Sequence, residues 1–284
     1  MKKPLNFKFN PAIILCALVL FAFSEKPFTS EVKKTDNYEL VNIWKMPDEL
    51  EEISGLSWIS KNKVAAVQDE DGILFIYDLD KEEITAEIEF ADDGDYEGVA
   101  IHGKDAYVMR SDGRLFEILD FEKDDSLVNT FESLLSDDDD VESLTLDKKK
   151  NRLLMTPKDR DGDHKKYKGV YAFDLNTRKM LAEPIARIGM SFKEFEDFAK
   201  DKMYDNLRPS DIAVHPQSGN LFVLEGVRPK LVEFDQMGKP MNIYIFDKDD
   251  LWQPEGLTFS PDGRLFICNE ADDDEGTIVE VRLN

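Results

Sequence analysis

The chain is patterned as short hydrophobic stretches with alternating polar positions, separated by turns. Five segments share one outline: an acidic residue, a small residue or Gly, alternating apolar residues, a turn, and two more strand patterns. The carboxylates that lead these segments are Glu52, Glu97, Glu142, Asp211 and Glu255. They are spaced 45, 45, 69 and 44 residues apart. A period near 45 residues is typical of a four-stranded propeller blade.

The rest of each segment agrees with this interpretation. Turn residues that tolerate tight hairpins separate the predicted second and third strands, as in Asp71-Gly72 and Asp262-Gly263. The fifth segment ends after its third strand, and residues 38–44 supply a strand pattern that can complete it. We therefore predict an all-β fold, a five-bladed β-propeller closed by an N-terminal strand. A β-sandwich is the alternative, but it does not explain the 45-residue period.

The 69-residue interval contains one insertion, between the third and fourth blades. Ser191 and Glu194 have the spacing of a capping box. Phe192, Phe195 and Phe198 follow at helical spacing. The pattern predicts a helix over residues 192–205, which either packs against the rim of the propeller or acts as a lid.

The N-terminus has the pattern of an export signal. Lys2, Lys3 and Lys8 precede an apolar run over residues 11–23, and Ala22-Phe23-Ser24 gives a small-x-small cleavage pattern. We predict a signal peptide over residues 1–24, a linker over 25–37 and a single propeller domain over 38–284. The predicted location is periplasmic or secreted. The alternative is an uncleaved segment, residues 11–24, that anchors the protein to the plasma membrane.

Charge limits the partners. Without residues 1–24 the chain has 33 basic and 60 acidic residues, a net charge of −27. Such a surface repels nucleic acid and anionic lipid and attracts cations. The expected partners are a divalent cation and a small molecule or envelope protein, with no nucleic acid and membrane contact only through an uncleaved N-terminus. We expect a monomer, and Cys268, the one cysteine left, to be buried without a disulfide.

The repeat also predicts a site. In an antiparallel blade the innermost strands all start at one face, so the five leading carboxylates are expected around one mouth of the channel. Crowded carboxylates have raised pKa values unless a cation neutralises them. Ca²⁺ suits such a ring because it takes 6–8 oxygen ligands in flexible geometry, with Mg²⁺ or Mn²⁺ as alternatives. The predicted metal ligands are Glu52, Glu97, Glu142, Asp211 and Glu255.

Other charged side chains follow the predicted second strands and reach the same face. Glu70, Glu225 and Glu270 are candidate general bases. Arg110 and Lys158 are candidates to bind an anionic group of a ligand, or to pair with the ring. The alternative for the whole ring is structural, with each carboxylate accepting backbone N–H groups or bonding between blades.

These motifs resemble the SdiA-regulated (YjiK/CarP-like) family of bacterial envelope proteins, from about residue 38 to residue 283. The resemblance implies a periplasmic or membrane-associated propeller, whose relatives are linked to calcium-responsive behaviour and likened to propeller phytases. Ser143 and the pair Ser210-Asp211 depart from the Glu-Gly pattern. The motifs that carry the resemblance span residues 52–58, 69–72, 95–100, 215–224, 253–257 and 269–270.

Three functions follow as hypotheses. The first is a calcium-binding envelope module that recognises a small molecule or protein on the carboxylate face. The second is a metal-dependent hydrolase of a phosphoester, phytase-like, or of a lactone. The third is an interaction scaffold without metal. Whether the protein is an enzyme stays open at this point.

Overall fold

The computed structural model describes residues 32–136, 138–162, 164, 166–198, 201–270 and 275–284. The predicted signal peptide or anchor, residues 1–24, lies outside the described residues. None of the described helices is long and apolar enough to span a membrane.

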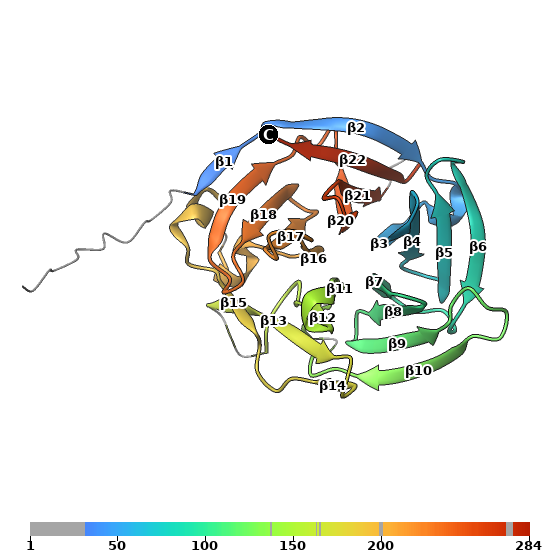
Figure 1. Cartoon of the computed structure of the whole chain (residues 1–284). Helices are drawn as coiled ribbons and strands as arrows, with labels where there is room; N and C mark the ends of the chain where they lie inside the picture. Colours follow the sequence, from blue (N-terminus) through green and yellow to red (C-terminus); the bar gives the residue numbers. More distant parts are fainter. Residues whose placement is uncertain (1–31, 137, 163, 165, 199–200, 271–274) are drawn as a thin grey trace, which may run out of the picture. The chain divides into compact units, whose positions relative to one another are not determined.

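Five sheets are arranged as a β-propeller, which confirms the predicted fold class (Figure 1). Within the first two blades each strand pairs antiparallel with the next strand in the sequence. Blade one contains β3 (Ile53–Ser60), β4 (Lys63–Gln68), β5 (Ile73–Asp78) and β6 (Glu83–Glu89). Blade two contains β7 (Tyr96–His102), β8 (Asp105–Arg110), β9 (Arg114–Leu119) and β10 (Leu127–Glu132).

The third and fourth blades each have a fifth strand. Blade three contains β11 (Thr145–Asp147), β12 (Arg152–Met155), β13 (Tyr167–Asp174), β14 (Lys179–Met180) and β15 (Ala186–Gly189), the last two both paired with β13. Blade four contains β16 (Asp211–Val214), β17 (Leu221–Glu225), β18 (Lys230–Phe234), β19 (Pro240–Ile245) and β1 (Lys33–Thr35). Strand β1 lies parallel to β19, in a segment that the sequence pattern indicated only as linker.

Blade five joins the two ends of the described chain. It contains β20 (Gln253–Phe259), β21 (Leu265–Glu270), β22 (Thr277–Leu283) and the N-terminal β2 (Tyr38–Lys45). Strand β2 pairs antiparallel with β22, from Tyr38 opposite Leu283 to Lys45 opposite Thr277. The predicted closure by an N-terminal strand is therefore confirmed, and it covers the edge that β22 would otherwise expose.

The core lies between neighbouring blades. Each of the five clusters of buried hydrophobic residues joins two adjacent sheets of the described chain, and Cys268 is fully buried in the one between blades five and one. The glycines of the repeat permit this packing near the axis. A Cβ on Gly98 would lie 2.8 Å from the Leu144 Cβ, and one on Gly256 would lie 2.9 Å from the Leu56 nitrogen. Adjacent innermost strands approach too closely there for a side chain.

The insertion between blades three and four contains two short 3₁₀ helices, η3 (Lys193–Phe198) and η4 (Met203–Asn206). The predicted continuous helix over residues 192–205 was therefore wrong, because the described part of the insertion forms two separate 3₁₀ helices. Phe195 is fully buried against blade four, with its ring centroid 6.4 Å from that of Phe234. The Phe198 carbonyl accepts a hydrogen bond from Arg228, so η3 ends in tertiary contacts with blade four. Two further 3₁₀ turns are η1 (Asp48–Leu50) and η2 (Lys148–Lys150).

Candidate functional site

The innermost strands β3, β7, β11, β16 and β20 contact one another in a ring around the propeller axis (Figure 1). Because neighbouring strands are antiparallel, the start of each innermost strand lies beside the end of the second strand of its blade. Gln253, for example, pairs with Glu270 and Ile53 with Gln68. The residues that lead the repeats and those that follow the second strands therefore meet at one mouth of the channel.

A central cluster at this mouth comprises Glu97, Glu142, Glu255 and Lys158. The Lys158 Nζ donates to Glu142 Oε1. Its charge also acts on Glu97 and Glu255. The Glu142 and Lys158 side chains are 7% and 18% exposed, so these charges are largely removed from water. The central cluster brings together three predicted metal ligands and one predicted ligand-binding residue.

The pKa values of all three carboxyl groups in the central cluster are raised. Burial, followed by the charge of Glu142, raises the pKa of Glu97 to about 10. Burial also raises the pKa of Glu142 to about 8 and that of Glu255 to about 7, although Lys158 opposes the rise in both. Three carboxyl groups thus surround one ammonium, that of Lys158.

An acidic flank, Glu52, Asp69 and Glu270, adjoins the central cluster on the side of blades one and five. Burial, with the charges of Glu52 and Glu270, raises the pKa of Asp69 to about 6. Burial raises the pKa of Glu270, whose carboxylate accepts a hydrogen bond from the Gln253 amide. Glu52 is exposed. Acidic side chains therefore continue from the central cluster to the surface.

Two buried carboxylate oxygens of this region have no hydrogen-bond partner among the described residues. They are Glu142 Oε2 and Asp69 Oδ1. Buried polar atoms are nearly always paired, because an unpaired one costs about 1–3 kcal/mol. The unpartnered oxygen of Glu142 is therefore available to a further group.

Asp211 has a different environment from the other leading carboxylates. It is 2% exposed, and its oxygens accept hydrogen bonds from the backbone nitrogens of Ile212 at 2.7 Å, Leu257 at 2.7 Å and Leu144 at 3.3 Å. These donors come from blades four, five and three. Burial raises the pKa of Asp211 well above its ordinary value, while the backbone donors oppose the rise. Asp211 thus links three blades through backbone hydrogen bonds. This contact pattern agrees with the structural role that the sequence analysis gave as the alternative to metal binding.

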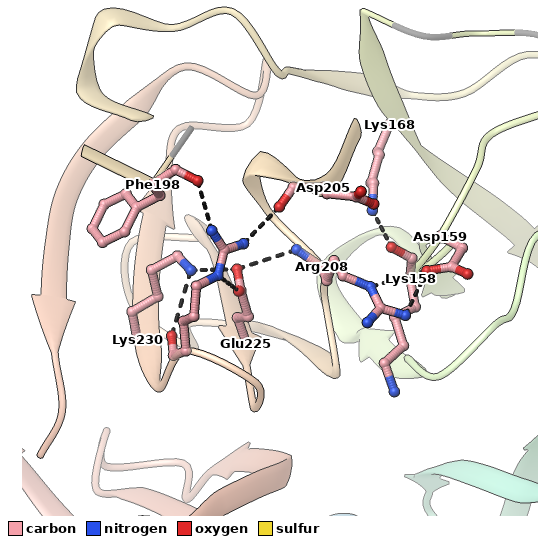
Figure 2. A network of polar contacts seen from close by, with 9 residues as sticks. Lys158, Asp159, Lys168, Phe198, Asp205, Arg208, Glu225 and Lys230 are labelled. Carbon is pink, nitrogen blue, oxygen red and sulfur yellow. Dashed lines mark hydrogen bonds and ion pairs between the residues drawn. The ribbon is translucent and has the colours of Figure 1, made fainter. Parts of the chain in front are cut away.

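Glu225 is also committed to structural contacts (Figure 2). Its carboxylate accepts from Arg228 Nε at 2.7 Å, from the Arg208 backbone nitrogen at 3.1 Å and from Lys230 Nζ. Its side chain is fully buried. A carboxylate paired with two cations and closed to solvent is a poor general base. Of the three candidate bases, Glu270 is the one that belongs to the acidic flank.

The structure does not bring Arg110 or Glu70 into the central cluster. Arg110 pairs with Asp112, and its guanidinium carbon lies 5.9 Å from the Phe116 ring centroid. Glu70 is exposed, and its backbone nitrogen donates to the Gln68 side chain at 2.6 Å. Their contacts therefore do not support a ligand-binding role for Arg110 or a catalytic role for Glu70 at the central cluster.

Several residues that support the cluster were not predicted from the sequence. Lys168 is fully buried in β13, and its ammonium donates to the Lys158 carbonyl (Figure 2). Burial lowers the pKa of Lys168 to about 7. Arg208 contacts Asp159 Oδ1 at 2.9 and 2.6 Å. A lysine inside a hydrophobic strand pattern gives no sequence signal for this contact.

The described residues contain no group of three or more His, Cys, Asp or Glu side chains already spaced to hold a metal ion. The carboxylates of the central cluster fit a cation by their chemistry, since they supply hard oxygen ligands and one unpartnered oxygen. They would have to converge further to coordinate it. Lys158 supplies the positive charge that the structure shows among them.

A cavity of about 420 Å³ lies away from the cluster, at the opposite ends of the strands of blade five. His215, Phe259, Arg264 and Arg282 are among the residues that line it. Its cations are already paired, Arg264 with Asp262 and Arg282 with Glu39. The cavity is therefore separate from the central cluster and the acidic flank, and its two arginines already have acidic partners.

Together these features define a five-bladed β-propeller with a buried carboxylate–lysine cluster at one mouth of its channel. The chain belongs to the SdiA-regulated family, whose sequence profile matches residues 32–272. This confirms the resemblance noted in the sequence. Comparison with curated proteins gave no match.

Solved structures share the fold. Glutaminyl cyclase from Myxococcus xanthus is 12% identical, with a TM-score of 0.60 and coverage of 89% of this chain and 99% of that one. A chain of a nidogen–laminin complex is 14% identical, with a TM-score of 0.51 and coverage of 76% of this chain and 72% of that one. At such low identity these likenesses establish the propeller architecture alone.

Proposed function

We propose that this protein is an exported envelope propeller that binds a divalent cation at the central cluster. The observation that carries the proposal is the buried Glu142, with one oxygen unpartnered among the described residues and with two partly buried carboxyl groups, Glu97 and Glu255, beside it. Bringing a cation to these groups would remove the cost of burying them near one another. The sequence pattern of residues 1–24, which predicts an export signal, supports an envelope location.

Calcium is the proposed cation. The cluster offers only oxygen ligands, and their spacing requires a metal that accepts irregular, flexible coordination. The acidic flank can supply further oxygens from Glu52, Asp69 and Glu270. Mg²⁺ and Mn²⁺ are the alternatives, since both accept carboxylate ligands. Recognition of a small molecule or envelope protein on this face belongs to the same proposal, because a cation at an open mouth retains free coordination positions.

Calcium titration tests the proposal. A ligand that binds only the folded state raises the unfolding midpoint, and at about one hundred times its dissociation constant it adds about 2.7 kcal/mol of stability. We expect Ca²⁺ to raise the midpoint in a thermal unfolding assay and to give a saturable calorimetric signal. Glu142→Gln should abolish most of the shift.

Glu87→Gln is the matched control, because Glu87 is exposed on β6, away from the cluster. This variant should respond to Ca²⁺ like the unmodified protein. If millimolar Ca²⁺, Mg²⁺ and Mn²⁺ all leave the midpoint unchanged, the protein does not bind a cation at this cluster and the proposal is wrong.

A metal-dependent hydrolase of a phosphoester or lactone is the second proposal, favoured by Glu270. This carboxylate is half-buried, has a raised pKa and adjoins the cluster, as a general base requires. A bound cation would polarise the substrate and lower the pKa of water. Lys158 would steady the anionic group. A panel of phosphoesters and lactones tests this function. Hydrolysis that requires Ca²⁺ and is lost in Glu270→Gln would support it. If no substrate is hydrolysed, the hydrolase proposal is wrong and only the cation-binding function stands.

A further inference from the structure

Lys158 occupies the position in which a cation would be expected. Its ammonium donates to Glu142 Oε1 and lies within charge range of Glu97, Glu255 and Glu270. The side chain is only 18% exposed. Burying an ammonium is costly unless carboxylates compensate it, so this placement reflects the attraction of the cluster.

The backbone beneath Lys158 is fixed on both sides. The Lys158 nitrogen donates to the Asp140 carbonyl at 2.7 Å, and its carbonyl accepts from the buried Lys168 ammonium. The next residue, Asp159, is held by Arg208 through two hydrogen bonds (Figure 2). With its backbone held, Lys158 can change position only through its flexible four-carbon side chain.

The Lys158 side chain has an alternative anionic neighbour. Asp140 interacts electrostatically with Lys158 and is partly exposed. An ammonium that leaves Glu142 can therefore turn toward Asp140 and solvent without losing all of its negative surroundings. This movement would free both oxygens of Glu142.

We infer that Lys158 is a tethered counter-cation, which neutralises the central cluster in the absence of metal and must be displaced by a divalent cation. The inference rests on the proposed function and adds the residue that sets its affinity. It accounts for two observations together: the described carboxylates have no metal-binding spacing, and an ammonium sits among them.

The consequence is that Lys158 weakens cation binding. Removing a unit positive charge a few ångströms from a divalent cation relieves repulsion that, at an effective dielectric near 20, corresponds to about tenfold or more in affinity. We expect Lys158→Gln to bind Ca²⁺ at least tenfold more tightly than the unmodified protein in isothermal titration calorimetry. Lys158→Arg, which keeps the charge, should not bind more tightly than the unmodified protein.

Lys179→Gln is the matched control, because it removes one positive charge from the exposed edge of the same blade. Its affinity should change by less than about twofold, since exposed charges far from the site are screened. Circular dichroism verifies that each variant is folded. If Lys158→Gln does not fold, Lys158→Arg still tests the inference, because tighter Ca²⁺ binding by Lys158→Arg than by the unmodified protein would contradict it.

Two negative results are distinguishable. Ca²⁺ binding by the unmodified protein with equal or weaker binding by Lys158→Gln overturns the tethered counter-cation and leaves the proposed function standing. No binding by either protein overturns both. Binding by Lys158→Gln alone supports the counter-cation but overturns the proposed function, because Lys158 then keeps the cluster of the unmodified protein closed to Ca²⁺.

Discussion

Asp211 and Glu142 stand at equivalent positions in two neighbouring blades, yet their carboxylates have different surroundings. Asp211 accepts three backbone hydrogen bonds, whereas Glu142 pairs with Lys158 and keeps one oxygen unpartnered among the described residues. The same repeat position thus supplies a structural link in one blade and a candidate ligand in another. The difference follows from what lies next to each carboxylate in space.

Asp211→Ala should destabilise the propeller. The substitution leaves the backbone nitrogens of Ile212 and Leu257 without their buried acceptor, and each unsatisfied buried donor costs about 1–3 kcal/mol. We expect the free energy of unfolding in urea to fall by about 3 kcal/mol or more. Asp249→Ala, at an exposed position, should change it by less than about 0.5 kcal/mol. Equal stability of the two variants would contradict the structural role of Asp211.

The stability of the metal-free protein should fall as pH rises. Glu142 has an ordinary pKa of 4.5, and burial raises it to about 8 in the folded protein. A raised folded-state pKa favours the folded protein fully below the unfolded value, and this contribution is lost as pH rises through the folded value. Urea unfolding with a chelator between about pH 5 and pH 8 should show a loss of a few kcal/mol.

Glu142→Gln separates this effect from the general repulsion among the acidic residues. The amide stays neutral, so the pH dependence of unfolding should become shallower in the variant. Added Ca²⁺ should also reduce the loss at high pH in the unmodified protein. A dependence as steep in Glu142→Gln as in the unmodified protein would show that Glu142 keeps an ordinary pKa.

At the scale of elements, Arg228 in the loop after β17 links the insertion to blade four. Arg228 donates to the carbonyls of Phe198 and Asp205, at 2.6 Å each, and to Glu225 at 2.7 Å. Its guanidinium therefore joins the end of η3, the inside of η4 and the buried carboxylate. Gly226, in the same loop, lies against Glu255, so this loop also borders the central cluster.

Arg228→Ala should loosen the insertion without unfolding the propeller. The two carbonyls lose their charged donor, and contacts of this kind contribute about 1.5–3 kcal/mol. We expect faster amide hydrogen exchange in η3 and η4, with little change in the central strands β17 and β21. Arg187→Ala, which removes an exposed pair with Glu183, should leave the exchange unchanged. Unchanged exchange in both variants would show that hydrophobic burial of Phe195 alone holds the insertion.

At the scale of the whole molecule, the ring depends on pairing between the two ends of the described chain. Strand β2 covers β22 over its full length, and the Trp44 indole donates to the Leu79 carbonyl of blade one at 2.9 Å. Removing β2 would expose the edge of blade five and part of the cluster of buried residues between blades five and one.

A protein that starts at Met46 should therefore lose much of its stability. In calorimetry, we expect its thermal midpoint to fall by about 10 °C or more. We also expect unfolding to stop being a single cooperative transition. A protein that starts at Asp36 lacks only β1 and keeps β2, so its midpoint should fall by a few degrees at most. If both truncations behave alike, closure by β2 is not what holds the ring.

The sequence alone was sufficient to predict the propeller, its five blades and its closure. Each blade repeats the same order of acidic residue, small residue, alternating strand and tight turn, and such local patterns are visible without coordinates. Strand β1 escaped prediction because a three-residue strand has too short a pattern. The insertion was located correctly, but its helical form depended on contacts with Phe234 and Arg228 that periodicity cannot show.

The candidate site was also predictable only in part from the sequence. The sequence determined which acidic residues lead the innermost strands and hence that they face one mouth of the channel. Only the tertiary structure decided what each carboxylate meets there: backbone nitrogens for Asp211, two cations for Glu225, an ammonium for Glu142. The physical reason is that charge interactions depend on distance and burial, and residues from different blades come within range of one another only once the ring has closed.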